Sequence, residues 1–145
     1  MNNIKNTMEN KSVIVLLSGG IDSTTLLAQL TNEGYEVTAL SFDYGQKHIE
    51  ELQFAKQNAL YYKVKQHKIV SISPDLFSSS ALVNKEKQLT TYVDGKLPKN
   101  QVNAYVPFRN LLFVSMALSM AESLNCSTIY AAFNKDDGIN YWDCS

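Results

Sequence analysis

An apolar run that ends in a glycine pair constrains this chain more than any other feature. Residues 13–17 are all apolar, and Ser18-Gly19-Gly20-Ile21-Asp22-Ser23 follows directly. The run predicts a buried strand, the glycines predict a sharp turn, and the hydroxyls that follow predict a helix beginning near Asp22. Such a helix aims unpaired N–H groups and the positive end of its dipole at the turn, which favours phosphate or pyrophosphate. An ordinary strand–turn–helix junction with an N-cap is the alternative.

The remaining apolar patterns predict strands and helices in alternation. Strands are predicted at 36–42, 66–70 and 127–132, and helices at 24–30, 49–60 and 111–124. Short connections between alternating strands and helices are typical of a parallel sheet with helices on both faces. We therefore predict an α/β, Rossmann-like fold, with an irregular segment over 71–105 and a loop-like tail from residue 133.

Composition excludes several classes of function. Thirteen basic and fourteen acidic side chains give a net charge of −1, so bulk charge attracts neither nucleic acid nor an anionic membrane. No apolar run reaches the length that spans a bilayer. The two cysteines lack C-x-x-C spacing and indicate neither a disulfide framework nor a zinc site. We expect a cytoplasmic protein with a disordered polar leader at 1–11 and one domain at 12–145.

Polar residues follow the predicted strands, at the edge where doubly wound sheets bind ligands. A polar segment at 43–48 follows the second strand and another at 134–143 follows the fourth. Arg109 heads a predicted helix, where the dipole disfavours a cation, so an anionic partner such as phosphate is expected. Asp22 is either a helix cap or a magnesium ligand beside phosphate, and Asn110 is a candidate helix cap. His67 is interpreted as structural.

Four stretches resemble one subfamily of the N-type ATP pyrophosphatase (PP-loop) superfamily, 7-cyano-7-deazaguanine synthase. They are LLSGGIDSTT, ALSFDYGQKH, YVPFRNLLF and FNKDDGINYWDC, and the resemblance as a whole runs from about Val13 to Cys144. The resemblance implies an adenine nucleotide alpha hydrolase-like fold and a PP-loop ATP-binding domain. It also implies ATP-dependent conversion of 7-carboxy-7-deazaguanine and ammonia to the nitrile, through an adenylated intermediate, in the queuosine pathway. The partners expected are small molecules.

The resemblance further implies roles for individual residues, with ATP and Mg²⁺ as cofactors. Asp22 and Arg109 are the expected catalytic residues. The expected ATP-binding residues are Leu17, Ser18, Gly19, Gly20, Ile21, Asp22, Ser23, Thr24, Thr25, Leu26, Leu27, Phe42, Asp43, Tyr44, His48 and Arg109. The expected substrate-binding residues are Asn134, Asp136, Asp137, Tyr141 and Asp143, without a decision on which aspartate contacts the deazaguanine.

The chain departs from the subfamily pattern in ways that keep alternatives open. Phe108 stands where the subfamily has glycine, and Trp142 where it has proline. Family members continue further and carry four cysteines that bind Zn²⁺; those ligands are not in this sequence, so no metal ligand is assigned. The alternatives are an inactive or nucleotide-binding-only truncated remnant, or another PP-loop amide-forming or tRNA-thiolating enzyme. An uncovered sheet edge would favour self-association, for example as a homodimer.

Overall fold

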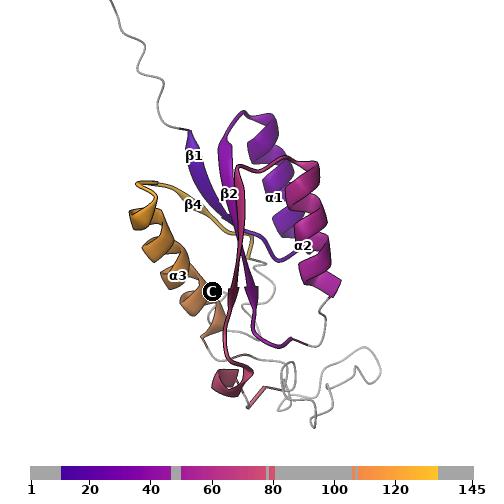
Figure 1. Cartoon of the computed structure of the whole chain (residues 1–145), viewed down its shortest axis with the longest axis vertical. Helices are drawn as coiled ribbons and strands as arrows, with labels where there is room; N and C mark the ends of the chain where they lie inside the picture. Colours follow the sequence, from indigo (N-terminus) through magenta and orange to yellow (C-terminus); the bar gives the residue numbers. More distant parts are fainter. Residues whose placement is uncertain (1–10, 47–49, 78, 81–105, 107, 134–145) are drawn as a thin grey trace, which may run out of the picture.

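The computed structural model describes residues 11–46, 50–77, 79–80, 106 and 108–133. Within these ranges the chain forms a layered α/β domain (Figure 1). All of the predicted leader except Lys11, and most of the predicted irregular segment, lie outside the described residues.

A parallel four-stranded sheet forms the centre of the domain. Its strands are β1 (Ser12–Leu16), β2 (Glu36–Asp43), β3 (Gln66–Ser71) and β4 (Ile129–Tyr130), in the order β3-β2-β1-β4. The chain therefore builds outward from β1 to β3 and then returns to the other side of β1. In open α/β sheets such a reversal of strand order leaves a crevice outside the carboxyl ends of the strands. Here the crevice is expected between β1 and β4.

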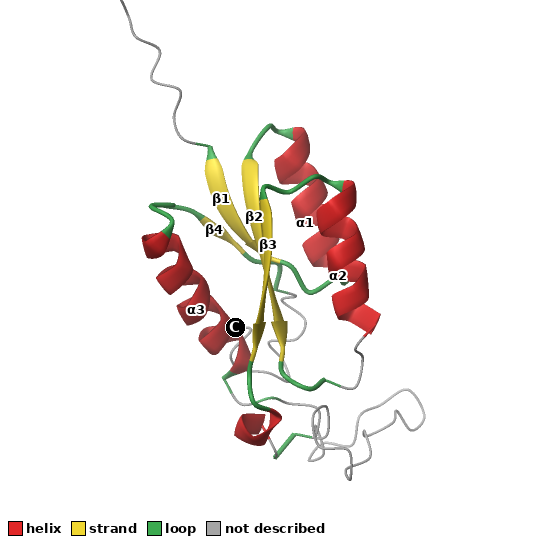
Figure 2. Ribbon diagram, viewed as in Figure 1, coloured by secondary structure: helices red, strands yellow, loops and turns green. Residues whose placement is uncertain are grey.

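Helices cover both faces of the sheet, which confirms the predicted fold class. Helices α1 (Ile21–Asn32) and α2 (Glu50–Tyr61) lie side by side on one face, and α3 (Arg109–Ser123) lies on the other (Figures 1 and 2). A short 3₁₀ helix, η1 (Pro74–Phe77), falls in the segment predicted to be irregular. Its buried Phe77 explains the local order, since the ring joins the core below α3.

Two hydrophobic cores, one on each face, explain why the β1 sequence is apolar without interruption. Val13, Val15 and Leu17 pack with apolar residues of α1 and α2, whereas Ile14 and Leu16 pack in the core that contains Ala117 and Ala121 of α3. Successive side chains of a strand point to opposite faces, so a strand covered on both faces shows a continuous apolar run rather than alternation.

The element boundaries differ from the predictions at two functionally relevant places. Helix α1 begins at Ile21, close to the start near Asp22 predicted from the hydroxyl residues and three residues before the span 24–30 predicted from the apolar spacing. It begins there because Gly20 already has the extended conformation of an N-cap (φ −75°, ψ 170°). Strand β4 has only two residues instead of the predicted six. It pairs with β1 alone, through Ile14 with Ile129 and Val15 with Tyr130.

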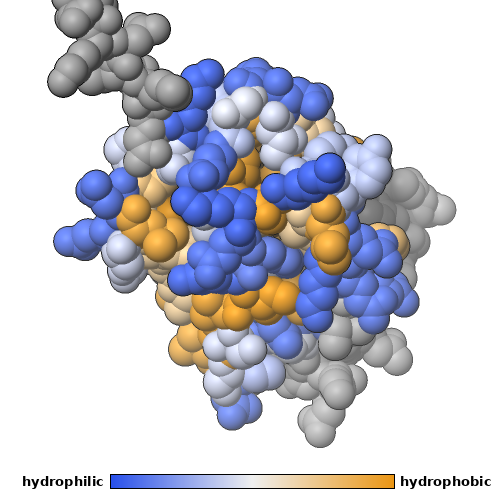
Figure 3. Space-filling model, turned by 45° about the horizontal axis from the view of Figure 1, so that its top comes forward, coloured by the Kyte–Doolittle hydropathy of each residue, from blue (hydrophilic) through white to orange (hydrophobic). Residues whose placement is uncertain are grey.

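Apolar side chains also reach the surface, as orange areas among hydrophilic ones in Figure 3. Ile21 is 84% exposed at the start of α1, and Leu111 and Leu118 of α3 are both more than half exposed. Among the described residues, no helix combines the length and the hydropathy needed to cross a bilayer.

Candidate functional site

The glycine turn after β1 is shaped by the close approach of helix α2. Gly19 has φ +90°, in the left-handed region that favours glycine. A Cβ on Gly19 would collide with the backbone oxygen of Glu51 and would lie 2.8 Å from the backbone nitrogen of Ala55. The absence of a side chain at Gly19 thus lets the turn pack against α2. At Gly20, a Cβ would meet only the Ser18 hydroxyl, at 3.4 Å.

The hydroxyl groups of two serines form hydrogen bonds within the turn. The Oγ atoms of Ser18 and Ser23 lie 3.0 Å apart, and Ser23 Oγ donates to the backbone oxygen of Gly20 at 3.1 Å. The Gly20 N–H donates to Ser18 Oγ at 3.2 Å. These bonds hold the turn in one shape, with the start of α1 directly behind it.

The structure corrects both cap interpretations. The N-cap of α1 is Gly20, with no side-chain cap bond, and Asp22 lies inside the first turn of the helix. The N-cap of α3 is Phe108, and Asn110 is a buried residue within the helix. Phe108 has φ +51°, a left-handed conformation that glycine adopts more readily. This geometry would suit glycine, the residue that the resemblance led us to expect at this position.

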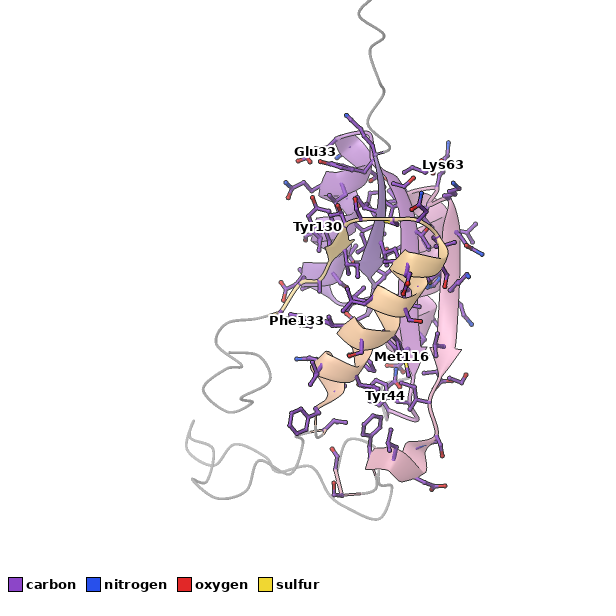
Figure 4. All side chains as sticks on the ribbon, turned by 90° about the vertical axis from the view of Figure 1, so that its left-hand side faces the viewer. Glu33, Tyr44, Lys63, Met116, Tyr130 and Phe133 are labelled. Carbon is purple, nitrogen blue, oxygen red and sulfur yellow. The ribbon has the colours of Figure 1, made fainter. Side chains whose placement is uncertain are left out.

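A cavity of about 290 Å³ lies beyond the carboxyl ends of the strands. This volume is at the lower end of the range typical of small-molecule sites, roughly 300–1,000 Å³. The Ser18–Ser23 turn, the end of β2, the start of α3 and the segment after β4 all contribute to its wall. The lining residues are Leu16, Leu17, Ser18, Asp22, Ser23, Leu40, Phe42, Tyr44, Gln46, Glu51, Arg109, Asn110, Phe113, Ala131, Ala132 and Phe133. Figure 4 shows Tyr44 near the start of α3, and Phe133 just past β4.

Arg109 is held in the cavity wall by Tyr44. An Arg109 Nη1 proton is donated to the Tyr44 hydroxyl at 3.3 Å, between residues that are 65 positions apart in the chain. Tyr44 is itself buried and contacts the rings of Phe77 and Phe113. Phe113 also stacks on Phe42, with ring centroids 3.9 Å apart. An aromatic layer therefore supports the tyrosine that orients the guanidinium group.

The predicted site residues fall into three groups. Those that line the cavity are Leu17, Ser18, Asp22, Ser23, Phe42, Tyr44 and Arg109. Those described by the structure that do not line it are Gly19, Gly20, Ile21, Thr24, Thr25, Leu26, Leu27 and Asp43. His48, Asn134, Asp136, Asp137, Tyr141 and Asp143 lie outside the described residues.

Several residues that do not line the cavity make structural contacts. Leu27 is fully buried in the core below α1. Thr24 Oγ1 accepts a hydrogen bond from Asn58 Nδ2 of α2 at 2.9 Å, and Thr25 Oγ1 donates to the Ile21 carbonyl. Asp43 Oδ1 accepts from the Gly45 N–H, at 3.2 Å, and so shapes the turn after β2.

Three polar residues of the cavity wall, Gln46, Glu51 and Asn110, were not among the individually predicted site residues. The Gln46 side chain makes two hydrogen bonds to the backbone after β2. Its Oε1 accepts from the Tyr44 N–H, and its Nε2 donates to the Phe42 carbonyl oxygen. Glu51 lies in the first turn of α2, and Asn110 lies next to Arg109 at the start of α3. Gln46 and Asn110 sit inside the SFDYGQ and PFRN stretches, so the motifs that carried the resemblance already contained them. Nothing in the local pattern singled out Glu51.

A hydrogen-bonded chain of side chains crosses the sheet behind the turn. The Ser41 hydroxyl, almost fully buried on β2, donates to the backbone oxygen of Leu17 at 2.5 Å. His67 Nε2, on β3, lies 2.8 Å from the same Ser41 oxygen. Burial lowers the pKa of His67 below its usual value, and the nearby positive charge of Lys56 lowers it further. The imidazole is therefore neutral at pH 7.

The described residues contain no group of three or more His, Cys, Asp or Glu side chains placed to hold a metal ion. Two carboxylates, those of Asp22 and Glu51, line the cavity. Mg²⁺ commonly takes one or two protein carboxylates and completes its shell with water and substrate phosphates. The cavity wall therefore offers the oxygen ligands that a magnesium–phosphate complex uses.

Comparison with known proteins assigns the chain to a family. The family model for queuosine biosynthesis protein QueC matches residues 12–145. The chain belongs to the QueC family. Relatives of the QueC chain named 7-cyano-7-deazaguanine synthase are 42% identical over 135 residues in Rickettsia bellii, and 43% identical over 135 residues in Desulfitobacterium hafniense. A further one in Leptospira interrogans is 42% identical over 141 residues.

These alignments cover 92%, 92% and 97% of this QueC chain, but 60%, 55% and 57% of the respective relatives. The chain thus spans somewhat more than half the length of the curated relatives it matches. Among solved structures, the NH3-dependent NAD synthetase of Campylobacter jejuni aligns with a TM-score of 0.56 at 22% identity. That alignment covers 90% of this chain and 51% of the synthetase. It supports the fold alone.

Proposed function

We propose that this QueC chain carries the ATP site of a 7-cyano-7-deazaguanine synthase. In the proposed reaction, the carboxylate of 7-carboxy-7-deazaguanine attacks the α-phosphorus of ATP and pyrophosphate leaves. Ammonia then displaces AMP to give the amide. A second adenylation, on the amide oxygen, followed by loss of AMP and a proton gives the nitrile. The names of the relatives support the product, and the cavity supports the use of a phosphate-bearing substrate.

The observation that carries the proposal is that two anion-binding features face one cavity. The start of α1, with Ser18 and Ser23, forms one wall, and the Arg109 guanidinium forms another. Helix N-termini bind phosphate through their unpaired N–H groups and dipole, and arginine binds phosphate through charge-assisted hydrogen bonds. In the proposed complex these groups hold pyrophosphate and neutralise the charge that develops as it leaves. Asp22 would supply a carboxylate oxygen to Mg²⁺, and the ion would offset negative charge on the phosphates.

The apolar part of the cavity is proposed to hold the adenine. Phe42, Tyr44 and Phe113 supply aromatic surface, and Phe133 extends it past the end of β4. Deazaguanine recognition is assigned to Asn134, Asp136, Asp137, Tyr141 and Asp143, because they directly follow the cavity-lining segment that ends at Phe133. A carboxylate there would accept hydrogen bonds from two adjacent N–H donors of the base.

Binding and turnover test the proposal separately. Titration with MgATP is expected to give saturable binding that Arg109→Ala weakens about 10- to 100-fold, the range for loss of a charge-assisted hydrogen bond of roughly 1.5–3 kcal/mol. The matched control is Lys65→Ala, which also removes one positive charge. Lys65 is exposed and pairs with Glu36, at the end of the sheet opposite the cavity. Equal affinities for the wild-type protein and Arg109→Ala would refute the assignment of Arg109.

Release of pyrophosphate in the presence of ATP, 7-carboxy-7-deazaguanine and ammonia tests the reaction itself. The expected result is release that depends on the deazaguanine, together with formation of the nitrile. Binding of MgATP without release would mean that the chain is a nucleotide-binding domain without turnover. No binding at all would refute the proposed ATP site.

A further inference from the structure

The carbonyl group that precedes the phosphate-binding turn is held by a side chain, from inside the sheet. Leu17 is the last residue before Ser18, and its N–H donates to the Leu40 backbone oxygen at 2.8 Å. Its carbonyl accepts the proton of the Ser41 hydroxyl. Ser41 is only 1% exposed, so solvent does not compete for this bond. Both polar groups of the Leu17 backbone are therefore fixed to β2.

The direction of these hydrogen bonds also determines which tautomer the neutral His67 ring adopts. A serine hydroxyl has one proton, and Ser41 gives it to Leu17. The Ser41 oxygen must then accept from His67 Nε2, which lies 2.8 Å away. Neutral His67 is thus the tautomer that carries its proton on Nε2. The hydrogen bonds run in one direction, from β3 through β2 to the end of β1.

This chain of bonds controls the geometry of the first residue of the turn. The peptide group is planar, so fixing the Leu17 carbonyl also fixes the direction of the Ser18 N–H. Ser18 in turn bonds Gly20 N and Ser23, the contacts that give the turn its shape. A rotation of the Leu17–Ser18 peptide would therefore displace the Ser18 hydroxyl from Ser23 and from the cavity wall.

We propose that Ser41 and His67 are positioning residues, which hold the Ser18–Ser23 turn in the conformation that binds the phosphates of a nucleotide. The inference rests on the proposed ATP site, and it adds two residues that do not line the cavity themselves. Ser41 acts on the turn through the Leu17 carbonyl. His67 acts through Ser41, by occupying its oxygen so that the hydroxyl proton points at Leu17.

The first test compares MgATP affinity in variants that are verified to be folded. Ser41→Ala removes both hydrogen bonds and is expected to raise the Kd about tenfold, whereas Ser41→Thr keeps the hydroxyl and restores affinity to within about twofold. Thr38→Val is the matched control, because it replaces a buried hydroxyl on the same strand, farther from the turn. Its Kd is expected to equal that of the wild-type protein. Unchanged affinity in Ser41→Ala would overturn the proposal.

His67 provides a second variant in case Ser41→Ala does not fold, since its side chain is only half-buried. His67→Leu removes the donor and is expected to raise the Kd severalfold, while His67→Gln offers an amide donor and recovers part of the loss. Equal affinity in all three His67 proteins would contradict its role.

The second test needs no nucleotide and separates this inference from the proposed function. Imidazole ¹⁵N spectra of the wild-type protein are expected to show the His67 Nε2–H tautomer, and Ser41→Ala is expected to shift that tautomer balance. The same variant is expected to move the backbone amide signals of Ser18, Gly19 and Gly20, which Thr38→Val leaves in place. An Nδ1–H tautomer in the wild-type protein, or unmoved turn signals in Ser41→Ala, would refute the positioning role. If the tautomer and amide results are as expected but the wild-type protein does not bind MgATP, the proposed ATP site fails, while the control of the shape of the turn by Ser41 and His67 stands.

Discussion

Replacing Gly19 by alanine tests the contact between the glycine turn and helix α2 directly. The new Cβ would collide with the backbone oxygen of Glu51 and approach the backbone nitrogen of Ala55 to 2.8 Å, so neither neighbour can move as a flexible side chain would. Alanine at the observed φ of +90° adds a conformational cost of about 1–2 kcal/mol. Displacing packed backbone adds about 1–3 kcal/mol, by analogy with overpacked cores.

Gly19→Ala is therefore expected to lower the free energy of unfolding by about 2–5 kcal/mol, a large part of the roughly 5–15 kcal/mol of a typical domain. Urea unfolding followed by circular dichroism measures it. With a slope of about 1.5 kcal/mol per molar urea, the midpoint falls by roughly 1–3 M.

Gly20→Ala is the matched control for this measurement. Gly20 has an ordinary φ of −75°, and its Cβ would meet only Ser18 Oγ, at 3.4 Å. The expected loss is below about 1 kcal/mol, the scale of a changed N-cap residue. If Gly19→Ala loses no more stability than Gly20→Ala, the turn does not pack against α2 in solution as described, and the reasoning is wrong.

Two further predictions concern stability. Phe108→Asn is expected to raise the free energy of unfolding by about 1 kcal/mol, since asparagine tolerates the left-handed conformation observed at φ +51° better than phenylalanine does. A loss of stability in thermal or urea unfolding would contradict this. Because the pKa of His67 is lowered in the folded protein, the unfolded chain binds the proton first as pH falls. The stability contributed by neutral His67 is therefore complete above the unfolded value of 6.5 and declines as pH falls from there to the folded pKa. His67→Gln should remove that part of the pH dependence, and parallel pH profiles for the two proteins would refute it.

The fold was predictable because its signals are local. The apolar run of β1, the helical spacing in α1 and α3 and the order of elements were enough to predict a parallel sheet covered on both faces. The lengths of elements were less predictable, as the two-residue β4 shows. The length of β4 depends on how many of its residues form backbone hydrogen bonds with β1, and the sequence of β4 alone does not determine that number.

Site residues that lie within a recognisable sequence motif were predictable. Features that depend on contacts between distant segments of the chain were not. Ser18, Asp22 and Arg109 line the cavity as expected from their positions after a strand or at a helix start. The contact of Gly19 with α2 was not predicted, because the backbone that approaches this glycine comes more than thirty residues later in the chain. The Arg109–Tyr44 bond likewise joins segments that no sequence window contains together. The proposed roles of the residues at 134–143 stay predictions.

The cavity wall is built from several separate elements, so a molecule that binds there stabilises the folded state of the whole domain. The wall draws on the end of β1, the end of β2, the starts of α1 and α3 and the segment after β4, so no single unit of structure carries it. An occupant that recognises only the assembled wall stabilises the native state by about 2.7 kcal/mol at a concentration one hundred times its Kd. A substitution that weakens either core would then be partly compensated by such an occupant. The concentration of the occupant would thereby affect how much destabilisation by substitution the domain tolerates.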